Sequence, residues 1–140
     1  MTAVDSQQHQ LPTYEIIQHS LDAVAHPRDR GTHMRQLAAV MQHPNMHVHQ
    51  FGNTVFMALE THPGAALLTM HNADTPRNLI QNTIRAMHWL RDTLGLRQVV
   101  FSARTPSIRT LAQMMVRHAG LPGMRLDSAP DGRLALYLGQ

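Results

Sequence analysis

Two tight-turn dipeptides, Gly52-Asn53 and Pro63-Gly64, constrain the fold of this 140-residue chain more than any other feature. Gly and Asn tolerate the left-handed backbone that short hairpin turns require, and Pro-Gly is typical of a tight turn. The dipeptides divide a stretch rich in Val, Phe, Leu and Thr into segments near 46–51, 54–61 and 65–71. Strands joined by such short turns are antiparallel, so the pattern predicts a three-stranded meander.

A long amphipathic helix is predicted directly after the meander. Thr75 suits the N-cap, Pro76 suits the first helical position, and Gly95 marks the end. The apolar positions recur at helical spacing: Leu79, Ile80, Ile84, Met87, Leu90 and Leu94. Further elements follow: a strand near 96–103, a helix from Thr105-Pro106 to Gly120, and a hairpin that turns at Pro130-Asp131-Gly132.

The N-terminal third is predicted as a polar tail, a strand and a helix. Residues 1–12 are rich in Gln and end at Pro12, and the Ile-containing segment 13–19 predicts a first strand. A helical turn broken at Pro27 and a helix over about 32–42 follow. The element order is then β-α-β-β-β-α-β-α-β-β. Such an order predicts an α/β (α+β) domain over 13–140, with a mixed sheet and helices on both faces.

Composition excludes several classes of protein. The chain has no cysteine, which excludes thiol catalysis, disulfides and Cys-based zinc sites. It has no secretion signal and no apolar run of membrane-spanning length, so we expect a soluble protein without a membrane partner. All 12 basic residues are Arg, nine of them are spread almost evenly from Arg77 to Arg133, and the net charge is only +3. This spacing does not favour nucleic-acid binding, which uses clustered Arg and interleaved aromatics.

The predicted order resembles that of the GCN5-related N-acetyltransferase (GNAT) family. In that family the acetyl-CoA pyrophosphate rests at the start of the helix after the fourth strand, in a loop of pattern Gln/Arg-x-x-Gly-x-Gly/Ala. The stretch that runs into Thr75 occupies that place. The segment "RTLAQMMVRHAGL" is similar to the family's C-terminal helix, with Ala112, Met115, Gly120 and Leu121 at the packing positions.

The chain departs from the family at the positions that carry chemistry. No glycine lies between Gly64 and Gly95, although a pyrophosphate must approach the backbone closely. Pro76 removes an amide donor, Thr75 or Asp74 caps the remaining ones, and Asp74 also places a negative charge there. We therefore predict a self-capped helix start without cofactor; acetyl-CoA is the alternative, with Arg77 and Asn78 as fallback ligands.

The C-terminal helix departs from the family too. Arg109 stands in place of the family's Asn, and Val116 stands in place of the Tyr that would act as general acid. These differences favour a non-catalytic, GNAT-like interaction protein. The alternative is an N-acetyltransferase with an atypical cofactor loop.

A further resemblance is to small GNAT-like domains encoded in the virion gene blocks of tailed bacteriophages. It rests on "QFGNT", "THPG", "DTPRNL" and the Pro-Asp-Gly hairpin. The resemblance implies a virion component, internal or in head–tail or tail assembly, found in the virion or in the host cytoplasm before assembly. Its partners would be other protein subunits, a second copy of this chain included.

Several side chains are candidates for other roles. Glu60, near the end of a predicted strand, is the fallback catalytic base, and exposure is its simpler interpretation. His47 and His49 share one face of a strand and are weak metal-ligand candidates that lack a third ligand. Trp89 and Met114 are candidate interface residues, with core packing as the alternative. Three further histidines, His43, His62 and His71, are expected at the surface.

Overall fold

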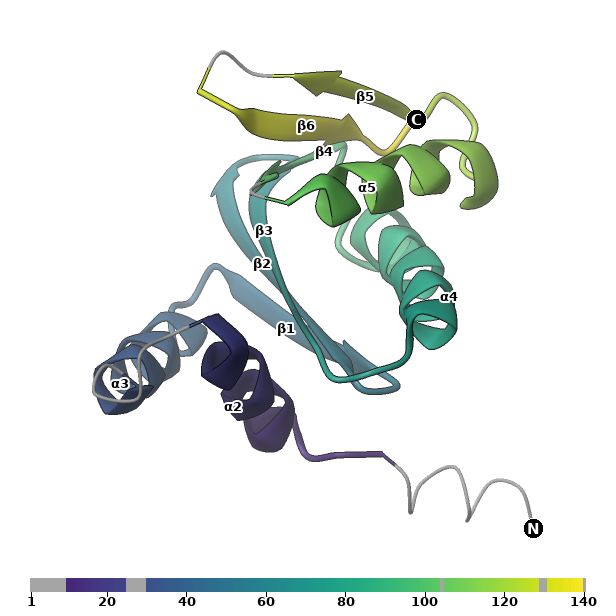
Figure 1. Ribbon diagram of the computed structural model, residues 1–140. Coiled ribbons are helices and arrows are strands. Elements are labelled where there is room, and N and C mark those ends of the chain that lie inside the picture. The colour runs from purple at the N-terminus through teal and green to yellow at the C-terminus, as the bar shows by residue number, and fades with distance from the viewer. Residues whose placement is uncertain (1–9, 25–29, 104, 129–130, 140) are drawn as a thin grey trace, which may run out of the picture.

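Six strands form one mixed sheet in the computed structural model, which describes residues 10–24, 30–103, 105–128 and 131–139. The spatial order of the strands is β1-β2-β3-β4-β6-β5 (Figure 1). The strands are β1 (Met46–Phe51), β2 (Thr54–His62), β3 (Ala65–Asn72), β4 (Gln98–Ser102), β5 (Arg125–Ser128) and β6 (Arg133–Tyr137). Only the pairing of β3 with β4 is parallel, as the predicted helical crossover between them requires.

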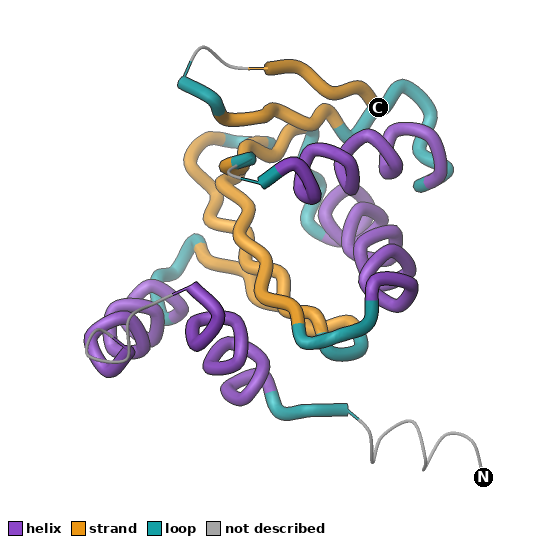
Figure 2. Tube along the Cα trace, viewed as in Figure 1, coloured by secondary structure: helices purple, strands orange, loops and turns teal. Residues whose placement is uncertain are grey.

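Helices cover both faces of this sheet, as Figures 1 and 2 show. One pair is α2 (Thr13–Val24) and α3 (Arg30–Met41), and the other is α4 (Pro76–His88) and α5 (Pro106–His118). The larger buried cluster lies on the side of α4 and α5 and includes Phe56, Met87 and Leu136. A smaller cluster on the other face contains Ile16, Val55 and Met57. The α/β architecture with a mixed sheet and helices on both faces is therefore confirmed.

The predicted first strand over 13–19 is wrong, because this segment belongs to helix α2. The amide of Ile16 donates to the carbonyl of Pro12 (3.2 Å), which is an i to i−4 helical bond. Ile16 and Ile17 are both buried. Adjacent side chains point to opposite faces in a strand, whereas a helix can bury both against the same sheet. The two Ile residues thus marked a helix rather than a strand.

The end of the expected tail is attached to the β1–β2 turn. The amide of Leu11 donates to Oδ1 of Asn53 (2.7 Å), and Nε2 of Gln50 donates to the carbonyl of Leu11 (2.7 Å). Residues 1–9, Pro27 and Pro130 lie outside the described residues. The predictions that concern those residues therefore stay predictions.

Helix α4 ends differently from the sequence-based expectation of one regular helix to Gly95. The backbone widens at Trp89 into the π-helical turn η1 (Trp89–Thr93), where the amide of Leu94 donates to the carbonyl of Trp89 (3.1 Å). Gly95 then reverses the chain with a φ of 68°, as a helix-terminating glycine does. Widened turns of this kind are rare and are often found near functional sites.

Candidate functional site

The two parallel strands at the centre of the sheet pair over only three residues each. Ala65, Ala66 and Leu67 of β3 face Gln98, Val99 and Val100 of β4. Beyond this point β3 continues to Asn72 and β4 to Ser102 without pairing to each other. The residues that follow on both strands line a cavity of about 410 Å³, here called the β3–β4 cleft.

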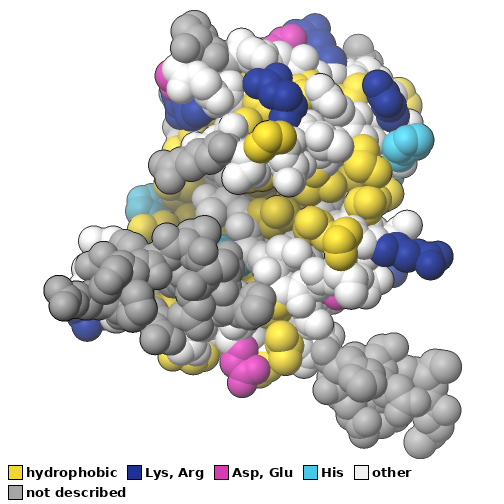
Figure 3. Space-filling view, in the orientation of Figure 1, with side chains coloured by type: hydrophobic (Ala, Val, Ile, Leu, Met, Phe, Trp, Pro, Cys, Tyr) yellow, Lys and Arg dark blue, Asp and Glu magenta, His cyan; other side chains and the backbone are white. Residues whose placement is uncertain are grey.

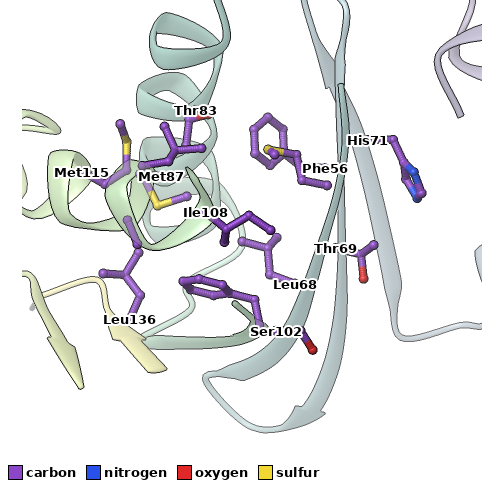
Figure 4. A pocket seen from close by; sticks show the side chains of 14 residues that line it. Phe56, Leu68, Thr69, His71, Thr83, Met87, Ser102, Ile108, Met115 and Leu136 are labelled. Atoms are coloured by element: carbon purple, nitrogen blue, oxygen red, sulfur yellow. The ribbon is translucent and has the colours of Figure 1, made fainter. Parts of the chain in front are cut away.

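The lining of the β3–β4 cleft is mainly apolar. Helices α4 and α5 supply one wall, and the strands supply the other (Figure 4). Its apolar side chains are Phe56, Leu68, Met70, Met87, Phe101, Ile108, Leu111, Ala112, Met115 and Leu136. A cavity of this size and character suits an elongated organic ligand better than water, which needs several polar partners.

The polar residues of the lining are Thr69, His71, Thr83 and Ser102, and the side chains of Thr69 and His71 point away from the apolar wall. Figure 4 shows Thr69 and His71 on the far side of β3 from Phe56 and Leu68, with Ser102 at the end of β4. His71 is 7% exposed, so the expectation of a surface histidine is wrong. Burial lowers the pKa of His71, because the charged imidazolium loses solvation there. The ring is therefore neutral at neutral pH, and its burial opposes protonation.

The start of α4 is capped as the sequence predicts. The amide of Asn78 donates to Oγ1 of Thr75 (3.3 Å), and Pro76 has no amide hydrogen. The amide of Leu79 donates to the carbonyl of Thr75 (2.8 Å). In the loop before the helix, the amide of Asp74 donates to Oδ1 of Asn72 (3.0 Å). The helix start thus satisfies most of its own donors.

Asp74 joins this helix start to the β1–β2 turn. Its Oδ2 accepts from the amide of Asn53 and from Nδ2 of Asn82, both at 2.8 Å, and its Oδ1 accepts from Nδ2 of Asn78 at 3.1 Å. Burial alone would raise the pKa of Asp74. The hydrogen bonds from Asn53, Asn82, Asn78 and the backbone of Thr75 outweigh burial and hold that pKa below its ordinary value.

Replacing Asp74 by alanine is expected to lower the free energy of unfolding by about 2–4 kcal/mol at pH 7, because several charge-assisted hydrogen bonds are lost together. A folded-state pKa below the unfolded one stabilises the protein at higher pH. The difference between wild type and variant should therefore be full above about pH 5 and shrink as the pH falls through the lowered pKa. Urea unfolding at several pH values measures this.

The matched control is Asn78→Ala, which removes one of these hydrogen bonds and leaves the others in place. We expect it to cost roughly 0.5–1 kcal/mol. Equal costs for the two variants, or a cost of Asp74→Ala that does not change with pH, would contradict the assigned role of Asp74.

The structure does not bring the fallback catalytic base or the weak metal candidates to the cleft. Glu60 lies beside His47, with Oε1 and Nε2 3.4 Å apart, and both side chains are about one-third exposed. The ring of His49 lies against Trp89 (5.3 Å between centroids) and Phe51 (4.3 Å). Among the described residues, no three His, Asp or Glu side chains gather as a metal site would require.

The two candidate interface residues lie at the edge of the larger core cluster. Trp89 and Met114 are both partly buried and pack against that cluster. Met115, next in sequence, is fully buried. Met115 therefore lies in the core, and Met114 lies at its edge. An interface role for Trp89 or Met114 remains a prediction.

Comparison with known proteins defines the fold. No protein-family model and no curated protein matches the sequence. Among solved structures, a chimera of spermidine N-acetyltransferase SpeG from Vibrio cholerae and hSSAT has a TM-score of 0.59 at 11% identity, covering 89% of this chain and 91% of that chain. An acetyltransferase from Agrobacterium tumefaciens str. C58 has a TM-score of 0.56 at 14% identity, covering 94% and 89%. The chain has a GNAT-like fold.

The residues at which the sequence departs from the GNAT pattern can now be located in the fold. Arg77 is exposed in the first turn of α4, and the side chain of Asn78 is bound to Asp74. Val116 is half-buried and is not among the residues that line the β3–β4 cleft. No helix in the described part of the chain is long and apolar enough to cross a membrane.

Proposed function

We propose that this chain is an N-acyltransferase that moves an acyl group from a thioester to an amine. The observation that carries the proposal is the β3–β4 cleft, an apolar cavity at the point where the two parallel strands of a GNAT-like sheet stop pairing. The two solved structures of similar fold, which cover 89% and 94% of this chain, are named acetyltransferases, and this supports the same activity.

The cleft has the chemistry that this reaction needs. Its apolar walls suit the arm and acyl group of a thioester and exclude competing water. In the reaction, the amine nitrogen attacks the thioester carbonyl carbon, a C–N bond forms and the C–S bond breaks. The amine loses one proton and the leaving thiolate gains one. His71 is the one titratable side chain among the described residues of the lining, but its ring lies on the far side of β3 from Phe56 and Leu68, so the proton of the amine passes to solvent water.

A thermal-denaturation titration tests the proposal. A ligand present at about 100 times its Kd adds about 2.7 kcal/mol to the stability of the folded state. For a chain of this length, that corresponds to a rise of roughly 8 °C in Tm. We expect such a rise with acetyl-CoA and with acetyl-pantetheine, and thiol release when a primary amine such as a polyamine or an N-terminal peptide is added. No rise with either thioester would contradict the proposal.

A second candidate function is a non-catalytic interaction protein. The observation that favours it is the occupied start of α4, where Asp74 and Thr75 take the donors that a pyrophosphate would use. The finer expectation, a bacteriophage virion component, rests on the short sequence similarities. This candidate predicts that no thioester raises Tm. It also predicts that replacing one of the partly buried residues Trp89 and Met114, as in Trp89→Ala or Met114→Glu, weakens assembly with a partner subunit.

A further inference from the structure

We propose that the start of α4 does not hold the diphosphate of a thioester donor bound in the β3–β4 cleft, so that the affinity for a CoA donor comes from its pantetheine arm alone. The inference rests on the proposed acyl transfer and names the donor class that the site accepts. Pantetheine thioesters should then serve as well as CoA thioesters, because the nucleotide of CoA stays in solvent.

The first reason is that the amides of the loop are already used. A diphosphate at a helix start needs free backbone N–H groups. The amide of Ala73 donates to the carbonyl of Asn53 (2.9 Å), and those of Asp74, Asn78 and Leu79 are bound as described above. Pro76 has none to give. Within the described loop, the amide of Arg77 alone makes no hydrogen bond to the protein.

The second reason is the charge at this position. The segment from Asn72 to Leu79 contains one acidic side chain, Asp74, and one basic side chain, Arg77. Asp74 stays ionised over the physiological range because its hydrogen bonds keep the carboxylate charged. An arriving diphosphate would meet a fixed negative charge at the helix start, and the exposed guanidinium of Arg77 would be its single cationic contact.

The third reason is that Asp74 is held in place from two sides. Its carboxylate joins the amide of Asn53 in one turn to Nδ2 of Asn82 in α4. The backbone of Gly52 passes so close that a Cβ there would lie 2.9 Å from Oδ2 of Asp74 and from the amide of Asn82. Moving Asp74 aside would break these hydrogen bonds in a place that has no spare room.

The cleft, in contrast, offers contact area for the arm. Hydrophobic side chains gather in the middle of the face shown in Figure 3, beside α4 and α5, and basic side chains lie toward its rim. Beyond Leu67, the edge of β3 that faces β4 has no partner strand in the described residues. Pantetheine is an extended chain with two amide groups, so it can lie along such an edge as a strand would.

Isothermal titration of the wild-type protein with CoA and with reduced pantetheine tests the inference. We expect the two Kd values to agree within about threefold. We also expect adenosine 3′,5′-diphosphate not to displace either thiol ligand. CoA binding more than about thirtyfold tighter than pantetheine would overturn the inference and leave the proposed acyl transfer standing. Binding of neither ligand would overturn both.

The variant Arg77→Ala provides a second, independent measurement. The inference gives Arg77 no contact with the donor, so the ratio of the two Kd values should be the same in this variant as in wild type. The substitution is at an exposed side chain and should leave Tm unchanged. A selective loss of CoA affinity of about tenfold, with pantetheine binding intact, would show a phosphate contact and overturn the inference.

Discussion

Replacing Ala112 by phenylalanine is expected to lower kcat/KM for acyl transfer by about 100-fold or more, since displacement of a bound substrate by about 1 Å can cost that much. Ala112 is 5% exposed on α5 and lines the β3–β4 cleft. A benzyl group at this position points into space that the thioester arm would need. Steady-state kinetics with acetyl-pantetheine and a primary amine measure the effect.

The fold should survive this substitution. Adding volume to a well-packed core costs about 1–3 kcal/mol, and here the open cavity accepts part of the new side chain. The matched control is Gln113→Phe, the same change at the next, exposed residue of α5, which should keep its activity. If Ala112→Phe remains folded and active, the cleft is not the donor site. If both variants lose activity, the loss reflects damage to α5 and not a filled cleft.

Replacing Phe56 by alanine is expected to lower the free energy of unfolding by about 3–5 kcal/mol. Phe56 is 1% exposed, belongs to the larger core cluster, and its ring lies 6.1 Å from that of Phe51 in an edge-to-face arrangement. Truncation removes this packing and joins the resulting void to the adjacent cleft. Urea unfolding, followed by the fluorescence of Trp89, measures the loss.

The control for this prediction is Leu67→Ala. Leu67 is 38% exposed on β3, so we expect a cost below about 1 kcal/mol. A cost of that same small size for Phe56→Ala would mean that the cluster between the sheet and α4 and α5 contributes little to stability. The assignment of the main core to that face would then be wrong.

Local chemistry allowed much of the fold to be predicted. The turn dipeptides Gly52-Asn53 and Pro63-Gly64 locate the meander, and its three strands lie within one residue of the expected segments. Thr75-Pro76 and Thr105-Pro106 both begin helices, as caps and first-turn prolines do. Each of these signals acts through neighbours in the sequence, and that is why the sequence shows it.

The sequence-based predictions were wrong where the conformation or burial of a residue depends on distant parts of the chain. The segment 13–19 has strand-like composition and forms a helix, because two adjacent Ile side chains are buried against the sheet. His71 was expected at the surface because it precedes a chain turn, and the tertiary structure buries it instead. Burial by distant elements leaves no local pattern in a single sequence.

The sequence by itself determined the order of the elements from the meander onward, the capped start of α4 and the acidic residue placed there. All of these depend on hydrogen bonds and turn preferences within a few residues. Only the tertiary structure decided that β3 and β4 part after three paired residues and that α4 and α5 line the resulting cleft. Strand separation and cavity shape depend on packing between segments far apart in the chain, which no local pattern encodes.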